Sequence, residues 1–311
     1  MRKTIITFGR LLHEAMTGWW EDKAPRFGAA VAYYSVLSIA PILTLFTPLA
    51  DLVLKRGTAQ AELRDQFERL IGGQGAEVLD TLVISATYHV GPGIGVKLLN
   101  GAVLLFAASA VFAQLQDALD TIWEVTPRPG RSLIWGFLRK RLLSFAMVLV
   151  IAFLLLTSLV MTTGLELLRH SLDQRFHGLL YVWMSANAII SFFVVMMLFA
   201  MIFKILPDAK IAWRDVWVGA MITSALFSFG KFAIGFYLGH RSFGTYYGAA
   251  GSVVALLVWV YFSAQILFLG AEFAHAYAKL RGDRIVPEPQ AMPLTKEARE
   301  QQGIPRVVSG E

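Results

Sequence analysis

Long apolar stretches alternate with short polar segments along the chain, and six of the apolar stretches have the length of a membrane-spanning helix. A hydrocarbon core of about 30 Å requires about 20 helical residues at roughly 1.5 Å per residue. The pattern therefore predicts an all-α fold, an integral membrane bundle of six transmembrane helices. We expect these helices at residues 27–50, 94–113, 142–163, 179–203, 216–238 and 248–278.

The segments outside the six helices predict the remaining organisation. Residues 1–26 combine apolar positions at helical spacing with several Lys and Arg residues, which predicts an interfacial amphipathic helix on the cytoplasmic side. Residues 51–93 carry apolar positions that predict short amphipathic helices in the first outer loop. Residues 282–311 are rich in Pro, Gln and charge, so we expect a disordered cytoplasmic tail.

The composition agrees with this membrane assignment. The chain has 311 residues, of which 56% are hydrophobic and 16% are charged, and its mean hydropathy is +0.57. Soluble domains carry about 25% charged residues. The absence of cysteine excludes disulfides, thiolate catalysis and Cys-ligated metals.

The positive charge indicates an orientation in the membrane. The formal net charge is +6, which alone would also suit a nucleic-acid partner. With both termini in the cytoplasm, the inner segments hold more than twice as many Lys and Arg residues as the outer ones. This bias follows the positive-inside rule, so we expect both termini inside, membrane lipids as partners and no nucleic acid.

Polar residues inside the predicted spans define a candidate substrate site. Lys231, Asn187 and Asn100 fall at a similar depth, roughly 10 Å from the outer interface. A Lys in hydrocarbon normally faces a cavity or a partner, so these groups could hold an anionic head group. The alternative is a Lys that extends to the interface and Asn residues that only join helices. Ser228 beside Lys231, and Gln265 on the last span, complete the candidate set.

A second set of residues suggests a gate or a structural ion pair. Tyr261, Gln265 and Glu272 lie on one face of the last span. Glu272 lies near its cytoplasmic end, where Arg26, Arg139 or Arg141 could pair with it, and a structural ion pair and a gating carboxylate both fit. The candidate gating residues are Glu272, Pro41, which kinks the first span, and Tyr34 on the same face as Pro41.

Catalytic chemistry finds little support in the chain. Asp117 and Asp120 would share a helical face and could hold a divalent ion for phosphodiester hydrolysis, but such a site needs further ligands and none is near. The other interpretation places both at a solvated cytoplasmic mouth. No GxxxxGK[ST] segment is present, so no ATP site is visible. We expect no catalytic residues, no metal and no cofactor.

Several stretches together resemble the YihY/BrkB family of membrane proteins. They are AVAYYSVLSIAPIL (residues 30–43), LQDALDTIWEV (115–125), ILPDAKIAWRDVWVGAMITSALF (205–227) and YYGAAGSVVALLVWVYFSAQILFLGAE (246–272). The resemblance covers about residues 15–280 and implies a six-helix protein of the bacterial inner membrane. The family once carried a ribonuclease label, and some members are linked to serum resistance or lipid export. Asp120 departs from the Asn expected in the family pattern.

Three functions remain open from the sequence. The leading hypothesis is a transporter or flippase of an envelope component, such as an anionic lipid or amphiphile. The alternative is a non-catalytic membrane scaffold that supports envelope integrity, and the remote alternative is a ribonuclease. Assembly into a homo-oligomer is compatible with all three.

Overall fold

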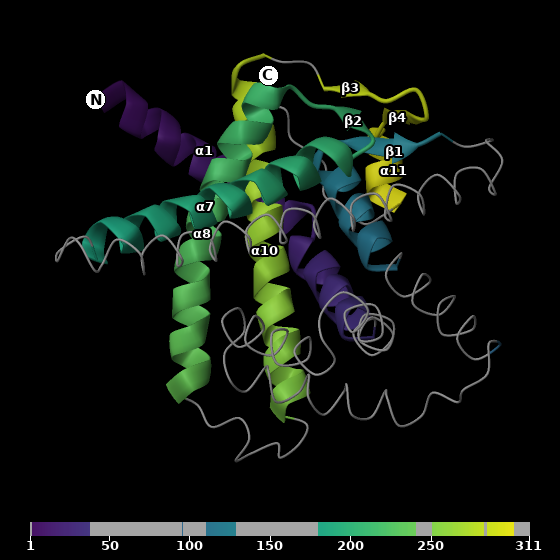
Figure 1. The fold of residues 1–311 in the computed structure, drawn as a ribbon. Helices are drawn as coiled ribbons and strands as arrows, with labels where there is room; N and C mark the ends of the chain where they lie inside the picture. Colours follow the sequence, from purple (N-terminus) through teal and green to yellow (C-terminus); the bar gives the residue numbers. More distant parts are fainter. Residues whose placement is uncertain are drawn as a thin grey trace. The chain divides into compact units, whose positions relative to one another are not determined.

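A computed structural model describes residues 2–37, 95, 110–128, 180–240, 251–282 and 285–301 (Figure 1). Most of these residues are helical. Pro41 and Asn100 of the candidate site, and the predicted second and third spans apart from a few residues, lie outside the described ranges. The helices described from end to end are α1 (Arg2–Glu21), α7 (Leu180–Ile205), α8 (Trp213–His240), α10 (Gly251–Leu280) and α11 (Lys296–Gln301), and residues 24–37 and 110–122 are helical as well.

Three helices coincide with the last three predicted spans. They are α7, α8 and α10, which begin and end within a few residues of the expected ranges. In the described part of the chain, Leu256–Leu280 of α10 is the one segment that meets a length and hydropathy criterion for a membrane span, with a mean hydropathy of 1.6. Ile189–Ile205 of α7 is a shorter apolar helix.

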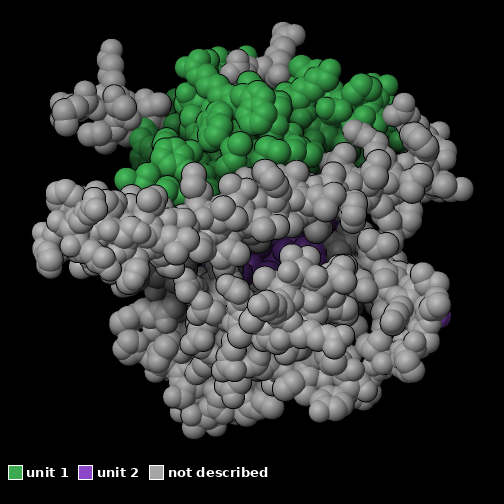
Figure 2. All heavy atoms as spheres, viewed as in Figure 1, with its two compact units in different colours: residues 1–22, 119–228, 267–311 green, residues 23–118, 229–266 purple. Residues whose placement is uncertain are grey.

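Contacts divide the chain into two compact units (Figure 2). The first contains residues 1–22, 119–228 and 267–311, and the second contains residues 23–118 and 229–266. Helices α8 and α10 therefore contribute residues to both units. The first unit holds all of α1, the short strands and α11.

The amphipathic N-terminal helix α1 packs inside the first unit. Leu11 and Ala15 are buried against Phe273 and Ala276 of α10. An apolar stripe on α1 stays exposed, formed by Phe8, Leu12, Met16 and Trp20 at four-residue spacing. An exposed apolar stripe on a helix with basic residues is what an interfacial membrane helix requires.

Helices α8 and α10 cross in the first unit through small residues. A Cβ added to Gly219 would lie 2.6 Å from the Cβ of Ala274, and one added to Gly270 would collide with the side chain of Thr223. Thr223 is fully buried, and its hydroxyl donates to the carbonyl oxygen of Gly219 at 2.7 Å. Small residues let two helix backbones approach closely, which is how membrane helices associate.

The C-terminal segment differs from the expected disordered tail, because residues 285–301 are ordered. Strand β4 (Ala291–Pro293) pairs antiparallel with β1 (Val125–Pro127), and β3 (Val286–Pro287) pairs with β2 (Ala209–Lys210). The strands and α11 lie together in Figure 1. Backbone pairing with distant segments supplies the order that the polar composition does not predict.

Asp120 also differs from expectation. It is buried rather than solvated, and its Oδ1 accepts a hydrogen bond from the backbone N–H of Asp208 at 2.7 Å. The side chain of Asp208 in turn accepts from Gln290 Nε2 at 3.0 Å. Asp120 therefore joins its own helical segment to the α7–α8 loop, and Asp208 joins that loop to the C-terminal segment, whereas Asp117 is exposed.

Candidate functional site

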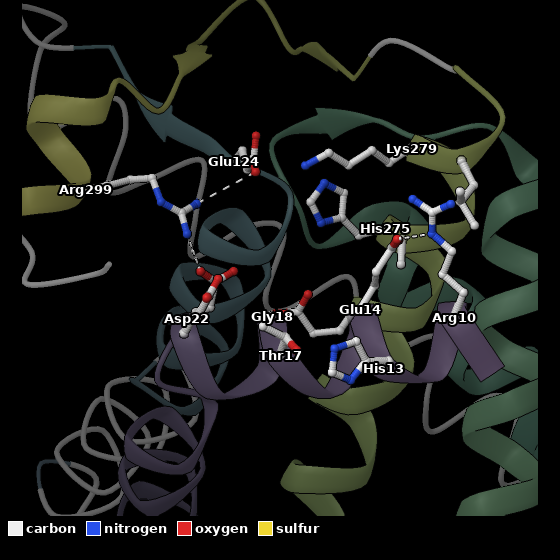
Figure 3. Close-up of a pocket in the computed structure, with 14 residues that line it drawn as sticks. Arg10, His13, Glu14, Thr17, Gly18, Asp22, Glu124, His275, Lys279 and Arg299 are labelled. Atoms are coloured by element: carbon white, nitrogen blue, oxygen red, sulfur yellow. Dashed lines mark hydrogen bonds and ion pairs between the residues drawn. The ribbon is translucent and has the colours of Figure 1, made fainter. Parts of the chain in front are cut away.

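A cavity of about 650 Å³ opens in the first unit between α1, the C-terminal end of α10 and α11 (Figure 3). We call it the charged cavity, because most of the side chains that line it can carry a charge. These side chains are Arg10, His13, Glu14, Glu21, Asp22, Glu124, Glu272, His275, Lys279 and Arg299.

Glu272 of α10 lies against Gly18 of α1. Only 3% of Glu272 is exposed, and a Cβ added to Gly18 would lie 2.5 Å from its Oε2. Glycine at position 18 therefore makes room for this carboxylate against the backbone of α1. The other oxygen, Oε1, is buried and accepts no hydrogen bond from the described residues.

Arg299 brings a guanidinium to the same place from the C-terminal segment. The short helix α11 begins after Thr295, whose hydroxyl accepts from the N–H of Ala298 at 3.2 Å, as an N-cap does. Arg299 Nη2 then donates to Asp22 Oδ1 at 2.5 Å, and its Nη1 lies 3.9 Å from Glu124 Oε1 (Figure 3). The buried guanidinium of Arg299 thus interacts with the carboxylates of both Asp22 and Glu124.

Of the influences on the pKa of Asp22, burial is the largest. It raises the pKa of the Asp22 carboxyl from 3.8 to about 6, although the charge of Arg299 and its hydrogen bond act in the opposite direction. The negative charge of Glu124 raises this pKa further, and a hydrogen bond with the side chain of Glu272 lowers it. Asp22 therefore changes charge close to physiological pH.

The other end of the cavity carries more basic groups. Arg10 Nε donates to Glu14 Oε1 at 3.0 Å in an exposed pair within α1. Lys279 and His275 project from α10 near these residues (Figure 3). The ring of His275 also packs against buried Trp123, with ring centroids 5.5 Å apart.

The structure describes only some of the sequence-predicted site residues. Ser228 donates to the carbonyl oxygen of Ser224 at 2.8 Å, so its hydroxyl is engaged within α8. Gln265 Nε2 lies 3.5 Å from the carbonyl oxygen of Ala24, in the second unit. Tyr34 is half-buried and packs edge-on against Tyr33.

The candidate substrate site around Lys231 stays a prediction. Lys231 lies in α8 and Asn187 in α7, but both side chains fall outside the described part of the structure. Glu272 is the predicted residue that borders the charged cavity, where Arg299 is a positively charged neighbour. Its predicted pairing with Arg26, Arg139 or Arg141 stays a prediction, because Arg139 and Arg141 lie outside the described residues and Arg26 belongs to the second unit. Sequence reasoning missed Arg299, Asp22 and Glu124 at this site.

Comparison with known proteins places the chain in a family. A family profile described as "Virulence factor BrkB" matches residues 15–295. The UPF0761 membrane protein of Pseudoalteromonas atlantica is 27% identical over 251 residues, covering 79% of this chain and 78% of that protein. That of Tolumonas auensis is 26% identical over 270 residues, covering 82% and 80%.

Other relatives are longer. The UPF0761 membrane protein of Ralstonia nicotianae is 28% identical over 268 residues, which cover 82% of this chain but 55% of that protein. No solved structure matches the chain. The profile match covers most of the sequence, and the chain therefore belongs to the virulence factor BrkB family of membrane proteins.

Proposed function

We propose that this chain is a multi-pass protein of the bacterial inner membrane that translocates an amphiphilic envelope component, such as an anionic lipid. The hydropathy pattern supports six spans, and the distribution of Lys and Arg supports cytoplasmic termini. Under this proposal the charged cavity lies at the cytoplasmic end of the path, because both α1 and α11 contribute to it.

The observation that carries the proposal is the buried carboxylate of Glu272. It stands near the end of the apolar helix α10 and borders the charged cavity. A carboxylate costs about 2.5–3.5 kcal/mol on insertion scales at the centre of a spanning helix, and a buried one retained in such a helix commonly marks a pathway for a substrate or ion. A packed scaffold gains nothing from a buried oxygen such as Glu272 Oε1, which accepts no hydrogen bond from the described residues, whereas a gate uses such an oxygen to bind and release a partner.

Glu272 and Asp22 act in this proposal as a gate on the cytoplasmic side. Arg299 holds the gate closed through its pair with Asp22. Lys231, Asn187 and Asn100 would bind the acidic part of the substrate deeper in the membrane. The chain performs no chemistry on the substrate, so we expect no enzymatic activity and no cofactor.

Reconstitution tests the proposal. The full chain would be placed in proteoliposomes that contain fluorescent phosphatidylglycerol, and dithionite would report the fraction of label that reaches the outer leaflet. We expect faster exchange than in empty liposomes and a loss of at least tenfold in rate for Glu272→Gln. Glu300→Gln is the control, because Glu300 is exposed and lies outside the charged cavity.

The scaffold alternative makes the opposite prediction. If the wild-type chain exchanges no lipid above the rate of empty liposomes, the translocation proposal is wrong and the scaffold explains the family better. If Glu272→Gln exchanges lipid as fast as the wild type, the gate is wrongly assigned.

A further inference from the structure

We infer that the junction of α7 and α8 is a docking surface for the head groups of anionic phospholipids in the cytoplasmic leaflet of the membrane. The surface consists of Lys204, Lys210, Trp213, Arg214 and Trp217, and we call it the tryptophan–basic platform. It goes beyond the proposed function, because a scaffold and a transporter would both dock to lipid in this way.

Two tryptophan rings on consecutive turns of α8 form the apolar half of the platform. Trp213 is 48% exposed and Trp217 is 39% exposed. Their ring centroids lie 6.4 Å apart with 32° between the ring planes, so the two rings present one continuous surface. Met221, one turn further along α8, is exposed as well. Four-residue spacing places the three side chains on one face of the helix, and this face leads from the α7–α8 loop into the apolar part of α8.

Basic side chains accompany the two rings. Lys204, in the last turn of α7, places its ammonium group 5.6 Å from the centroid of the Trp213 ring and donates to the carbonyl oxygen of Ile211. Lys210 and Arg214 are exposed. Among the residues that the structure describes, no carboxylate forms an ion pair with Lys210 or Arg214. Both positive charges are therefore available to a partner.

The acidic residues of the same region do not neutralise the platform. Asp208 and Asp215 are buried. Asp208 accepts a hydrogen bond from Gln290, and Glu288 accepts one from the same amide group. Asp215 stands in the first turn of α8, where the helix dipole stabilises a negative charge. The carboxylates of Asp208 and Asp215 are thus withdrawn from the exposed face, on which Lys210 and Arg214 remain.

A membrane interface is the partner that matches both halves of the platform. Tryptophan is enriched there, because its ring enters the apolar region while its N–H stays among the head groups. Lys and Arg residues at the same level attract anionic lipids. A free phosphate ion would leave both rings exposed to water. The expected cytoplasmic position of the α7–α8 loop assigns the lipids to the inner leaflet.

Quenching of tryptophan fluorescence tests the inference, because the two rings report on their own lipid neighbours. The full chain would be reconstituted in phosphatidylcholine bilayers that contain a small fraction of either phosphatidylglycerol or phosphatidylcholine with bromine near the head-group end of its acyl chains. We expect brominated phosphatidylglycerol to be preferred roughly tenfold. A double variant, Trp213→Phe with Trp217→Phe, should lose this excess quenching. Equal quenching by the two lipids, or an undiminished excess in the double variant, would overturn the inference.

A charge variant separates the platform from a general attraction between a basic protein and anionic lipid. Arg214→Gln should lower the preference for phosphatidylglycerol about fivefold, and high salt should lower it in the wild type through screening. Arg10→Gln is the matched control, because Arg10 is also an exposed helical arginine but is paired with Glu14. Equal losses from the two changes would show that net charge alone attracts the lipid, which would overturn the inference.

A single-stranded nucleic acid is the other partner that exposed aromatic rings and basic side chains would suit. Single-stranded RNA added to the full chain in detergent should leave the fluorescence of Trp213 and Trp217 unchanged. A saturable change that the double variant loses would assign the platform to nucleic acid and overturn the inference. Because quenching is measured without transport, the platform can be confirmed in a chain that exchanges no lipid, and lipid exchange by a chain without the quenching preference would refute the platform alone.

Discussion

Arg299 donates a hydrogen bond to Asp22 across 277 positions of sequence, with Nη2 and Oδ1 2.5 Å apart and both side chains buried. The contact ties the C-terminal segment to the end of α1. Even so, burial outweighs the guanidinium and raises the pKa of Asp22 to about 6. The pair therefore holds the segment in place while leaving one partner able to change its charge.

Loss of Arg299 should destabilise the protein more than loss of an exposed arginine. Breaking a buried pair by removing one partner costs about 3–5 kcal/mol, because the other charge stays buried. Arg299→Gln should therefore lower the unfolding temperature clearly, as followed by tryptophan fluorescence at pH 8. Arg10→Gln breaks an exposed pair with Glu14, which is worth about 0.5 kcal/mol, and should have little effect. Equal effects of the two changes would show that the buried pair contributes no more than the exposed one.

Asp22 should give the stability a defined pH dependence. Because its pKa is higher in the folded state, at about 6, than its ordinary 3.8, the folded state binds the proton more tightly. The stability that this group contributes is fully present below pH 4 and is lost as the pH rises through 6. Two pKa units correspond to roughly 3 kcal/mol as an upper bound.

The variant Asp22→Asn isolates this effect, since it cannot titrate at position 22. Measured from pH 4 to pH 7, the unfolding temperature of the wild type should fall relative to that of Asp22→Asn. Curves that run parallel over the whole interval would mean that Asp22 keeps its ordinary pKa.

A methyl group on Gly18 should disturb the charged cavity. The added Cβ would lie 2.5 Å from Glu272 Oε2, so the carboxylate or the helix must move. We expect Gly18→Ala to slow lipid exchange severalfold in proteoliposomes and to lower the unfolding temperature. Gly9→Ala is the matched control on the same helix, because a Cβ there meets nothing within 4 Å. If both variants behave alike, α1 does not lie against Glu272.

The crossing of α8 and α10 should tolerate no extra methyl group at Gly270. A Cβ there would lie 2.8 Å from the Cβ of Thr223 and closer still to its hydroxyl, and a buried β-branched side chain cannot turn away easily. Overpacking of this kind costs about 1–3 kcal/mol. Gly270→Ala should lower the unfolding temperature, and Thr223→Ala in the same chain should restore part of the loss. No recovery in the double variant would place the crossing elsewhere.

The sequence predicted the helical character of the described apolar segments better than it predicted the charged site. The ranges of α7, α8 and α10 follow from hydropathy, because long apolar runs have few alternatives to a helix. The polar stripe that includes Glu272 was also visible, since helical periodicity determines which residues share a face. These are local properties of the sequence, and a single chain reveals them.

The partners of Glu272 could not be found in the same way. Arg299 lies in a segment whose Pro, Gln and charge predict disorder, and it reaches the cavity only through the pairing of β4 with β1. Strand pairing between distant three-residue segments leaves no periodic signal. One local clue was present, because Thr295 followed by a helix-favouring run predicts a capped helix that carries Arg299. Asp120 was misjudged for a related reason, since its backbone partner at Asp208 is 88 positions away.

The candidate substrate site around Lys231 can be tested directly. Because the chain has no native cysteine, a single introduced thiol is the only one that a maleimide can label. Cysteines at positions 187, 228 and 231 should react with a membrane-impermeant maleimide from the periplasmic side of intact cells if an outward-facing cavity reaches them. Supply of excess anionic lipid should then reduce the labelling at least twofold. A cysteine at position 241, in the predicted outer loop, serves as the labelled control. Labelling at 241 alone would mean that Lys231 faces a closed bundle, and Glu272 would then have to be assigned a role that does not involve a path through the membrane.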